Sequence, residues 1–336
     1  MKIAVIGAGS WGTAVAGIAA QNVDCVLWAR RSELAQAINE QHENVDYLRG
    51  FPLNPALRAT DSLEAAWRGA DAIVVGVPSH GFREVLQDAA GYIPNDVPIL
   101  SLSKGVEQGS LMRMTEVIAS VLTEHPTDRI GVLSGPNLAK EIVQGQPAAT
   151  VIAMRDPHAA TMLQDAFMTP IFRVYTNPDV VGCEVAGALK NVVAIAVGIA
   201  HGLGYGDNSK AALITRGLAE LARLGVALGG NPMTFAGLAG MGDLIATCSS
   251  PQSRNRTVGV QLGEGRSLGE IVAEMNMVAE GVKSTEAVLA IAQTLGLELP
   301  VAEFVGQVLY LDAKAADLVP ELMLRSARSE LDGIPS

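Results

Sequence analysis

The chain opens on a glycine-rich turn between an apolar strand and a helix. The run KIAVI is followed by GAGSWG at residues 7–12 and then by an alanine-rich stretch. In this pattern Gly7 turns the chain sharply, Gly9 lets the backbone approach a pyrophosphate, and Gly12 lets the helix pack on the strand. A helix beginning near Ser10 points free N–H groups and its positive dipole end at the phosphates. The first twelve residues therefore predict a dinucleotide-binding start.

Apolar strand candidates then alternate with helical stretches up to about residue 178. The strand candidates are residues 25–29, 72–77, 99–102, 130–133, 149–154 and 172–175, and the helical stretches between them include 64–68, 82–90 and 111–122. This alternation predicts a parallel, doubly wound Rossmann-like sheet. From residue 179 the periodicity is helical only, with segments near 184–200, 210–224, 268–275, 284–295 and 302–313. Because 336 residues exceed the usual size of one core, we expect a dinucleotide-binding domain over 1–178 and an all-helical substrate-binding and dimerisation domain over 179–336.

The net charge, the cysteines and the apolar stretches limit which partners, metals and compartment we expect for this chain. A net charge of −11 argues against nucleic acid, which requires a positive footprint. The three cysteines are far apart, without metal-ligand spacing, which favours a reducing cytoplasm and no structural metal. No signal-peptide pattern is seen. The apolar stretch 180–203 approaches membrane-span length, but Glu184, Lys190, Asn191 and His201 interrupt it, so we expect a buried core helix and no membrane insertion.

The end of the second predicted strand bears on the choice of dinucleotide. NAD enzymes of this fold usually place an acidic residue there to hold the ribose hydroxyls. This chain has Arg30 and Arg31, and two guanidiniums suit a 2′-phosphate, so NADP is favoured over NAD. The alternatives are that one arginine is a solvated charge and that Glu33 reaches the ribose, which would allow NADH.

Three turns follow later strands and are expected to rim one crevice at the carboxyl edge of the sheet. They are residues 77–80, 103–105 and 134–137. Lys104 carries the charge in these turns. It is either a ligand-binding cation or an ordinary lysine in a surface loop.

Lys190 stands on a helix that is apolar around most of its circumference. Burial disfavours the ammonium form, which would suit the amine to general acid–base catalysis near neutral pH. The alternative is a structural ion pair, for which Glu184, six residues earlier, is a poor same-face partner.

Two later segments carry further polar residues. Asp243 and Thr247 are four residues apart and would share a helix face; Asp243 would orient Lys190, bind a substrate hydroxyl, or simply cap a helix. The run SRNR at residues 253–256 would start another helix, and a helix N-terminus with a guanidinium is a good phosphate clamp. By itself the run could equally be a solvated loop.

Taken in order, these segments resemble the NAD(P)-dependent glycerol-3-phosphate dehydrogenase family of bacterial type. The matching motifs are GAGSWGTA, VPSH, SKG, SGPNLAKE, GALKNVVAIAVGI, ALITRGLAE, GDLIATC and QSRNR, and they span nearly the whole chain. The resemblance implies an all-helical second domain like that of 6-phosphogluconate dehydrogenase. It also implies reversible hydride transfer between dihydroxyacetone phosphate and sn-glycerol 3-phosphate, for phospholipid synthesis.

The resemblance assigns roles to individual residues. It implies that Lys190 is the proton donor and acceptor, that Lys104 contacts substrate and cofactor, and that Asp243 takes part in catalysis. The residues it places against the substrate, besides Lys104, are Gly135, Asn137, Lys190, Asn191, Asp243, Thr247, Ser253, Arg254 and Asn255, with Arg254 and Asn255 as the phosphate-binding pair. Besides the glycines, and Arg30 from the argument above, those against the cofactor are Ser10, Trp11, Arg31, Ala139, Arg254 and Glu280.

Two positions differ from the pattern expected of bacterial members. Asn137 stands where Ser or Thr is frequent and can still donate and accept hydrogen bonds. His201 stands where an acid is common, and we expect it near the end of the long helix, where a cation is favoured, rather than in catalysis.

Two other functions compete with this one. The first is a different Rossmann dehydrogenase with a helical second domain, against which the QSRNR run argues. The second is a non-catalytic redox sensor, which would not need a buried lysine beside an acid. Because symmetric dimers are the commonest soluble assemblies, we expect a homodimer through the helical domain.

Overall fold

The computed structural model describes residues 1–275, 279–311, 313–324 and 329. Predictions for the remaining positions of the 179–336 region lie outside the described residues. Two compact units are present. The first comprises residues 1–103 and 112–180, and the second comprises residues 104–111 together with the described residues from 181 onward. The short segment Lys104–Leu111 thus belongs to the second unit, although it lies inside the predicted first domain.

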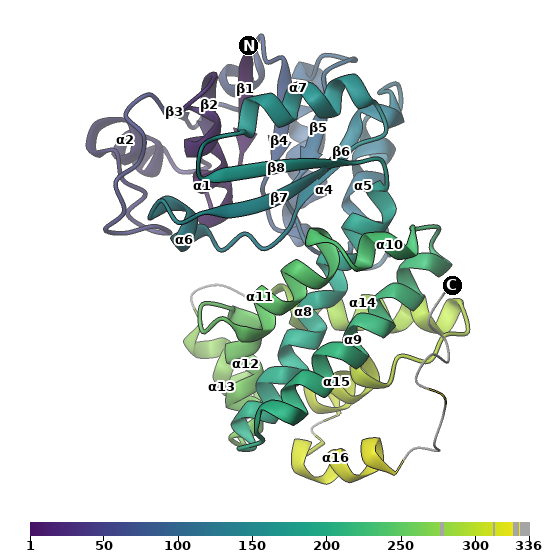
Figure 1. The fold of residues 1–336 in the computed structure, drawn as a ribbon. Helices are drawn as coiled ribbons and strands as arrows, with labels where there is room; N and C mark the ends of the chain where they lie inside the picture. Colours follow the sequence, from purple (N-terminus) through teal and green to yellow (C-terminus); the bar gives the residue numbers. More distant parts are fainter. Residues whose placement is uncertain (276–278, 312, 325–328, 330–336) are drawn as a thin grey trace. The chain divides into compact units, whose positions relative to one another are not determined.

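The first unit is built on one eight-stranded sheet (Figure 1). Its strand order is β3-β2-β1-β4-β5-β6-β7-β8. The strands are β1 Lys2–Ile6, β2 Asp24–Trp28, β3 Arg58–Thr60, β4 Ala72–Val75, β5 Ile99–Ser101, β6 Ile130–Ser134, β7 Ala148–Ala153 and β8 Phe172–Asn177. The helices are α1 Ser10–Ala19, α2 Ser32–Gln41, α3 Leu63–Trp67, α4 Ser79–Ala89, η1 Ala90–Tyr92, α5 Met114–Val121, η2 Thr127–Arg129, α6 Ala139–Val143 and α7 Pro157–Phe167.

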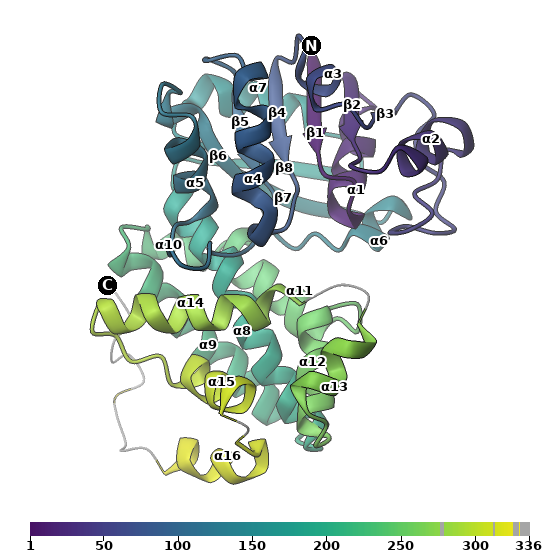
Figure 2. The ribbon, with the colours of Figure 1, turned by 180° about the vertical axis from the view of Figure 1, so that it is seen from behind.

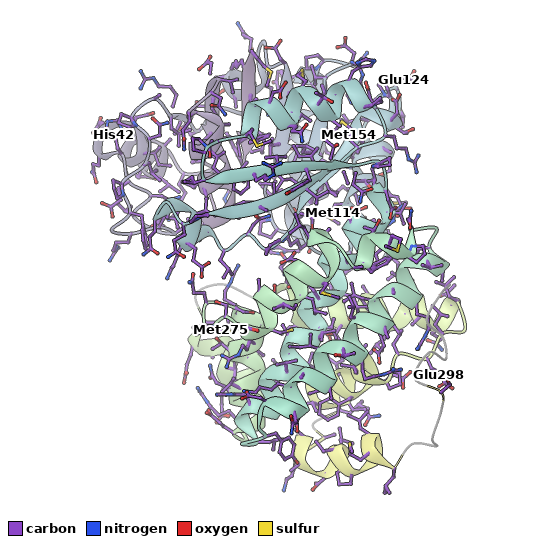
Figure 3. The ribbon with its side chains drawn as sticks, in the orientation of Figure 1. His42, Met114, Glu124, Met154, Met275 and Glu298 are labelled. Atoms are coloured by element: carbon purple, nitrogen blue, oxygen red, sulfur yellow. The ribbon has the colours of Figure 1, made fainter. Side chains whose placement is uncertain are left out.

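Alternating residues along the strands pack into two separate hydrophobic cores. On β1, Ile3 and Val5 pack in the core under α1 and α7, while Ala4 and Ile6 pack in the core under α3, α4 and α5. Figures 1 and 2 show these two helix layers on opposite faces of the sheet. Both faces are therefore covered, which explains the continuous apolar runs of the central strands. Met154 of the first core and Met114 of the second are labelled in Figure 3.

The sheet is parallel except where β7 pairs antiparallel to β6. The predicted doubly wound, mainly parallel sheet is confirmed, with one antiparallel pair that the sequence pattern did not indicate. The connection between the two strands contains only the five-residue helix α6, which spans about 7–8 Å. The chain therefore enters β7 from the edge of the sheet where β6 ends. The strand β3 was also not predicted, because it is a three-residue edge strand without an apolar run.

The second unit is all-helical among the residues described. Its helices are α8 Val180–Gly202, α9 Asp207–Ala227, α10 Pro232–Phe235, the π-turn η3 Leu238–Gly242, α11 Asp243–Ser249, α12 Arg254–Gly263, α13 Leu268–Glu274, α14 Glu280–Thr294, α15 Pro300–Tyr310 and α16 Ala315–Met323. The helix α8 is long and apolar enough to cross a membrane, but 94% of its most apolar window is buried inside the protein. It is the core helix that the sequence predicts, with His201 in its last turn.

Buried Glu220 connects two of these helices. Its carboxylate, on α9, accepts hydrogen bonds from the backbone N–H groups of Val301 (2.7 Å) and Ala302 (3.2 Å) in the first turn of α15. The carboxylate satisfies backbone donors that the helix itself leaves unpaired. Burial raises the pKa of Glu220 to about 7, although these two hydrogen bonds act in the opposite direction.

Candidate active site

The glycine turn at the start of the first unit is built for close approach. Gly7 has a φ of +110°, which favours glycine, and a Cβ added at Gly12 would lie 2.0 Å from the carbonyl oxygen of Gly7. A Cβ added at Gly9 would meet no atom of the described residues within 4 Å. Since α1 begins at the next residue, Ser10, its free N–H groups face a turn where backbone is open to a ligand.

Neighbouring side chains hold this turn in place. Fully buried Asn44 donates hydrogen bonds to the Ala8 carbonyl oxygen (2.9 Å) and to the Thr13 hydroxyl (2.8 Å). The Ser10 hydroxyl donates to the carbonyl oxygen of Tyr47 (3.0 Å), so it fastens the turn to the next loop. Sequence reasoning missed Asn44, because a single asparagine after a helix carries no pattern of its own.

Trp11 lies at the start of α1 beside the same turn. Its ring is tilted against Phe172, with centroids 6.5 Å apart. Its indole N–H is buried and has no hydrogen-bond partner in the described part of the chain, which leaves a donor for a bound group.

The two arginines after β2 differ in their surroundings. Arg31 pairs with the carboxylate of Asp46, and Arg30 is exposed. Glu33 is also exposed, in the first turn of α2. Cationic groups thus follow β2, and part of their charge is neutralised locally.

The loop after β6 carries the remaining predicted residues of this unit. The Asn137 amide donates to the Thr150 hydroxyl (2.8 Å), which itself donates to the Ser134 carbonyl oxygen (3.0 Å). The side-chain oxygen of Asn137 is buried and has no partner among the residues that the structure describes. Gly135 lies in the same loop and Ala139 begins α6.

The second unit brings Lys104, Lys190 and Asp243 into one cluster. One carboxylate oxygen of Asp243 lies 2.6 Å from the Lys104 Nζ, and the other lies 3.3 Å from the Lys190 Nζ. The Lys190 ammonium also donates to the Thr247 hydroxyl (2.8 Å) and to the Asn191 side-chain oxygen (3.2 Å). The side chains of Lys104, Lys190 and Asp243 are 18%, 7% and 4% exposed.

Local sequence explains why these groups meet. Asp243 and Thr247 lie one turn apart on α11, and the Thr247 hydroxyl donates to the Asp243 carboxylate (3.2 Å), so the predicted shared face is confirmed. Val106, two residues after Lys104, packs against Ala188 of α8 and Ala287 of α14. This apolar contact seats the Lys104 segment beside the helix that carries Lys190.

The cluster holds two cations and one anion away from water. Burial lowers the pKa of Lys190 to about 8; the Asp243 carboxylate opposes this shift and the Lys104 ammonium adds to it. An amine with this pKa exchanges its proton close to neutral pH. The surplus positive charge suits an oxygen that becomes negative during a reaction.

The start of α12 forms the other half of the site. Ser253 caps the helix, since its hydroxyl accepts from the Arg256 N–H (3.3 Å), and Arg254 is the first helical residue. Burial lowers the pKa of the Arg254 guanidinium, and the Glu280 carboxylate counteracts this. The predicted helix start at SRNR is therefore confirmed.

Asn191 joins the two halves of the site. Its side-chain N–H₂ donates to the Lys104 carbonyl oxygen (3.1 Å), and its oxygen accepts from Asn255 (2.9 Å) as well as from Lys190. The Asn255 oxygen accepts from the backbone N–H of Gly281 (2.9 Å). Sequence reasoning did not identify Gly281, although its place directly after Glu280 is a signal that could have found it.

A large apolar cavity of about 740 Å³ lies elsewhere in the second unit, among α8, α9, α15 and α16. None of the cluster residues line it, so cavity size does not locate the chemistry in this protein. Among the described residues, no group of His, Cys, Asp and Glu could hold a metal ion.

Comparisons with known proteins cover the whole chain. The family model for the N-terminus of NAD-dependent glycerol-3-phosphate dehydrogenase matches residues 2–160, and that for its C-terminus matches residues 179–320. Glycerol-3-phosphate dehydrogenase [NAD(P)+] 2 of Sphingopyxis alaskensis is 52% identical over 330 residues, with 98% of both chains covered. The enzyme of the same kind from Thermobifida fusca is 51% identical over 335 residues, with 99% of both covered.

Solved structures agree with these relatives. Glycerol-3-phosphate dehydrogenase from Coxiella burnetii is 38% identical, with a TM-score of 0.90 over 96% of this chain and 99% of that one. The Saccharomyces cerevisiae enzyme is 30% identical, with a TM-score of 0.84 over 97% and 99%. The resemblance drawn from the motifs is confirmed, and the chain belongs to the NAD-dependent glycerol-3-phosphate dehydrogenase family.

Proposed function

We propose that this chain catalyses reversible hydride transfer between NAD(P)H and dihydroxyacetone phosphate, which gives sn-glycerol 3-phosphate for glycerophospholipid synthesis. The observation that carries the proposal is the Lys104–Asp243–Lys190 cluster: a buried amine with a pKa near neutrality, in a chain of this family. Its catalytic residues are Lys190, Lys104 and Asp243. The cofactor-binding region is residues 1–178, and the substrate-binding region is residues 179–336 with Lys104–Leu111.

The proton chemistry follows from the cluster. When bound, the dinucleotide would supply the hydride that attacks the substrate's carbonyl carbon. As the C=O double bond becomes a single bond, the Lys190 ammonium donates a proton to the oxygen, and the Lys104 charge stabilises the developing alkoxide. In the reverse direction the neutral Lys190 amine removes the hydroxyl proton. Asp243 and Thr247 hold the amine in position throughout.

The residues around the glycine turn are suited to hold the dinucleotide. The open backbone at Gly9, the first turn of α1 and the indole N–H of Trp11, which no described residue accepts, offer donors to an anionic ligand. By resemblance, Ala139, Lys104, Arg254 and Glu280 also contact the cofactor. Arg30 and Arg31 favour NADPH over NADH, because a guanidinium fits a 2′-phosphate, while exposed Glu33 is the group that would favour NADH.

The substrate phosphate would be bound at the start of α12. Arg254 is a cation in the first turn of a ten-residue helix, where N–H groups and charge combine. Binding energy at the phosphate would hold the reacting carbon in place. By resemblance, Asn191, Thr247, Ser253 and Asn255 complete this pocket, together with Gly135 and Asn137.

The proposal is tested by cofactor oxidation at 340 nm with dihydroxyacetone phosphate, with NADPH and NADH in parallel. Unphosphorylated dihydroxyacetone is the control substrate. We expect rapid turnover only with the phosphorylated ketone, and faster with NADPH. Folded protein without turnover on either cofactor would overturn the proposal.

We further propose a cytoplasmic homodimer that needs no metal, joined through the helical region. The three cysteines Cys25, Cys183 and Cys248 are buried and form no disulfide among the described residues, as suits a reducing compartment. Light scattering coupled to size exclusion should give twice the mass of the 35.0 kDa chain. A monomer at working concentration would contradict the dimer.

A further inference from the structure

The side-chain amide of Asn191 has one orientation that satisfies all its neighbours. Its oxygen faces two donors, the Lys190 ammonium at 3.2 Å and the Asn255 N–H₂ at 2.9 Å. Its nitrogen faces an acceptor, the Lys104 carbonyl oxygen at 3.1 Å. A flipped amide would place N–H groups against two donors. The hydrogen bonds of Asn191 with Asn255 and with the Lys104 carbonyl therefore determine whether its side-chain oxygen faces Lys190 as an acceptor.

Asn255 is the partner that comes from another helix. It is 8% exposed, and its amide is used at both ends, toward Asn191 of α8 and toward the Gly281 N–H at the start of α14. A buried amide bound to two elements is held rigidly, because breaking either hydrogen bond leaves a buried polar group unpaired. Asn255 therefore fixes the Asn191 oxygen more firmly than solvent could.

The packing of α8 on α12 makes this contact possible. A Cβ added at Gly198 would lie 2.2 Å from the Arg256 carbonyl oxygen, and one at Gly259 would lie 2.1 Å from the Ile195 carbonyl oxygen. The two backbones thus touch one to two turns beyond the amide pair. This approach brings two short asparagine side chains within direct hydrogen-bond distance.

We propose that Asn255 is a positioning residue for the catalytic lysine, acting through Asn191, in addition to any contact with the substrate phosphate. The inference rests on the proposed function, in which Lys190 moves the proton. Arg254, next to Asn255, then binds the phosphate, while Asn255 keeps the acceptor of Lys190 in place. The phosphate end and the proton-transfer end of the site are coupled through one amide pair.

This role predicts a result that a phosphate ligand alone would not give. With Asn255→Ala the Asn191 amide is free to turn, so kcat/KM should fall about tenfold to a hundredfold, the value of a hydrogen bond to a charged group. The fall should be similar for dihydroxyacetone phosphate and for unphosphorylated dihydroxyacetone. Arg254→Ala is the contrasting variant, in which the fall should be much larger for dihydroxyacetone phosphate than for unphosphorylated dihydroxyacetone.

The pH profile gives a second readout. The charged and titratable groups that act on Lys190 are Asp243 and Cys248 from α11 and Lys104 from its own segment. Asn255→Ala leaves all three groups in place but no longer holds the Asn191 oxygen against the Lys190 ammonium. The ammonium form is then less stabilised, so the alkaline limb of the pH profile, where the rate of ketone reduction declines, should move to lower pH. Asn255→Asp keeps the side-chain size and adds a negative charge, so the limb should move to higher pH while the rate falls.

The controls separate this role from a loss of folding. Asn208→Ala, at an exposed asparagine on α9, should leave both rates and the pH profile unchanged. Circular dichroism and thermal melting check each variant, and Asn255→Asp serves if the alanine variant does not fold. The inference is overturned if both variants leave the limb in place and dihydroxyacetone turnover intact. No turnover by the wild-type protein would instead defeat the proposed function.

Discussion

Lys190 shows how a single residue is tuned by its surroundings. An isolated buried ammonium is costly, because nothing in an apolar interior replaces its hydration. Asp243 compensates part of this cost, but it is shared with Lys104. Burial is the main reason that the pKa of Lys190 falls to about 8, and the nearby charge of Lys104 lowers it further.

The pH dependence of catalysis follows from this residue. Reduction of the ketone requires the Lys190 ammonium, so its rate should fall as pH rises through about 8; oxidation requires the free amine and should rise over the same range. Initial rates in both directions measure this. In Lys190→Arg the guanidinium stays charged, so oxidation should be lost at every pH. An oxidation rate that does not change between about pH 7 and 9 would rule out this role.

Proton transfer and phosphate binding should separate under mutation. Lys190→Ala removes the proposed proton donor, so kcat should fall about a hundredfold to ten-thousandfold with little change in KM. Arg254→Ala removes the proposed phosphate-binding guanidinium, so KM for dihydroxyacetone phosphate should rise about tenfold to a hundredfold. Steady-state kinetics on both variants test the division. Equal losses of kcat at unchanged KM would show that the two roles are misassigned.

Much of the site could be predicted residue by residue. The isolation of Lys190 on an apolar helix and the four-residue spacing of Asp243 and Thr247 indicate functional positions from the sequence alone. Asn44 could not be found this way, because its role depends on hydrogen bonds to residues distant in sequence. The same limit kept the Asn191–Asn255 pair hidden, since nothing in either motif shows that α8 and α12 touch.

At the scale of elements, the packing of α8 against α12 depends on paired glycines. Gly198 and Gly202 on α8 face Gly259 and Gly263 on α12, and a Cβ at any of the four would lie within 2.4 Å of a backbone oxygen of the other helix. Both pairs have the spacing of one helical turn that allows close helix contact. The sequence contains both repeats, but it does not reveal that they meet.

The four contact glycines Gly198, Gly202, Gly259 and Gly263 form a glycine seam between α8 and α12, and substitution within it should destabilise the protein. Gly259→Ala forces the helices apart and should lower the free energy of unfolding by about 1–3 kcal/mol or more. Gly269→Ala is the matched control, because a Cβ there meets no described atom within 4 Å and alanine is the better helix former. It should be neutral or up to about 1 kcal/mol stabilising. Urea denaturation compares the two; equal stability of both variants would mean that the seam relaxes freely.

Elements with a continuous apolar pattern were predictable, and those without one were not. β1, β2, β4, β5 and β6 follow from buried runs, and α8 from its length and composition. β3 was missed because pairing at a sheet edge does not require apolar residues. The antiparallel direction of β7 could not be predicted, because a strand pattern alone carries no direction.

At the scale of the whole molecule, Glu220 should make stability depend on pH. Its pKa in the folded protein is about 7, above the ordinary value of 4.5, so the folded state holds a proton that the unfolded state has lost between these values. Its contribution is therefore present below about pH 4.5 and is lost as pH rises through about 7. The size of the loss is at most about 3 kcal/mol.

Glu220→Gln isolates this contribution, because glutamine keeps an acceptor for the start of α15 but cannot ionise. Denaturation midpoints measured from about pH 5 to 8 should fall with pH more steeply in the wild type than in the variant. Lys190 is present in both proteins, so the rise in stability that its lowered pKa produces from near pH 8 upward cancels in the comparison. Parallel curves for the two proteins would mean that the two hydrogen bonds from α15 stabilise the carboxylate enough to cancel the effect of burial, so that the link between α9 and α15 would be insensitive to pH.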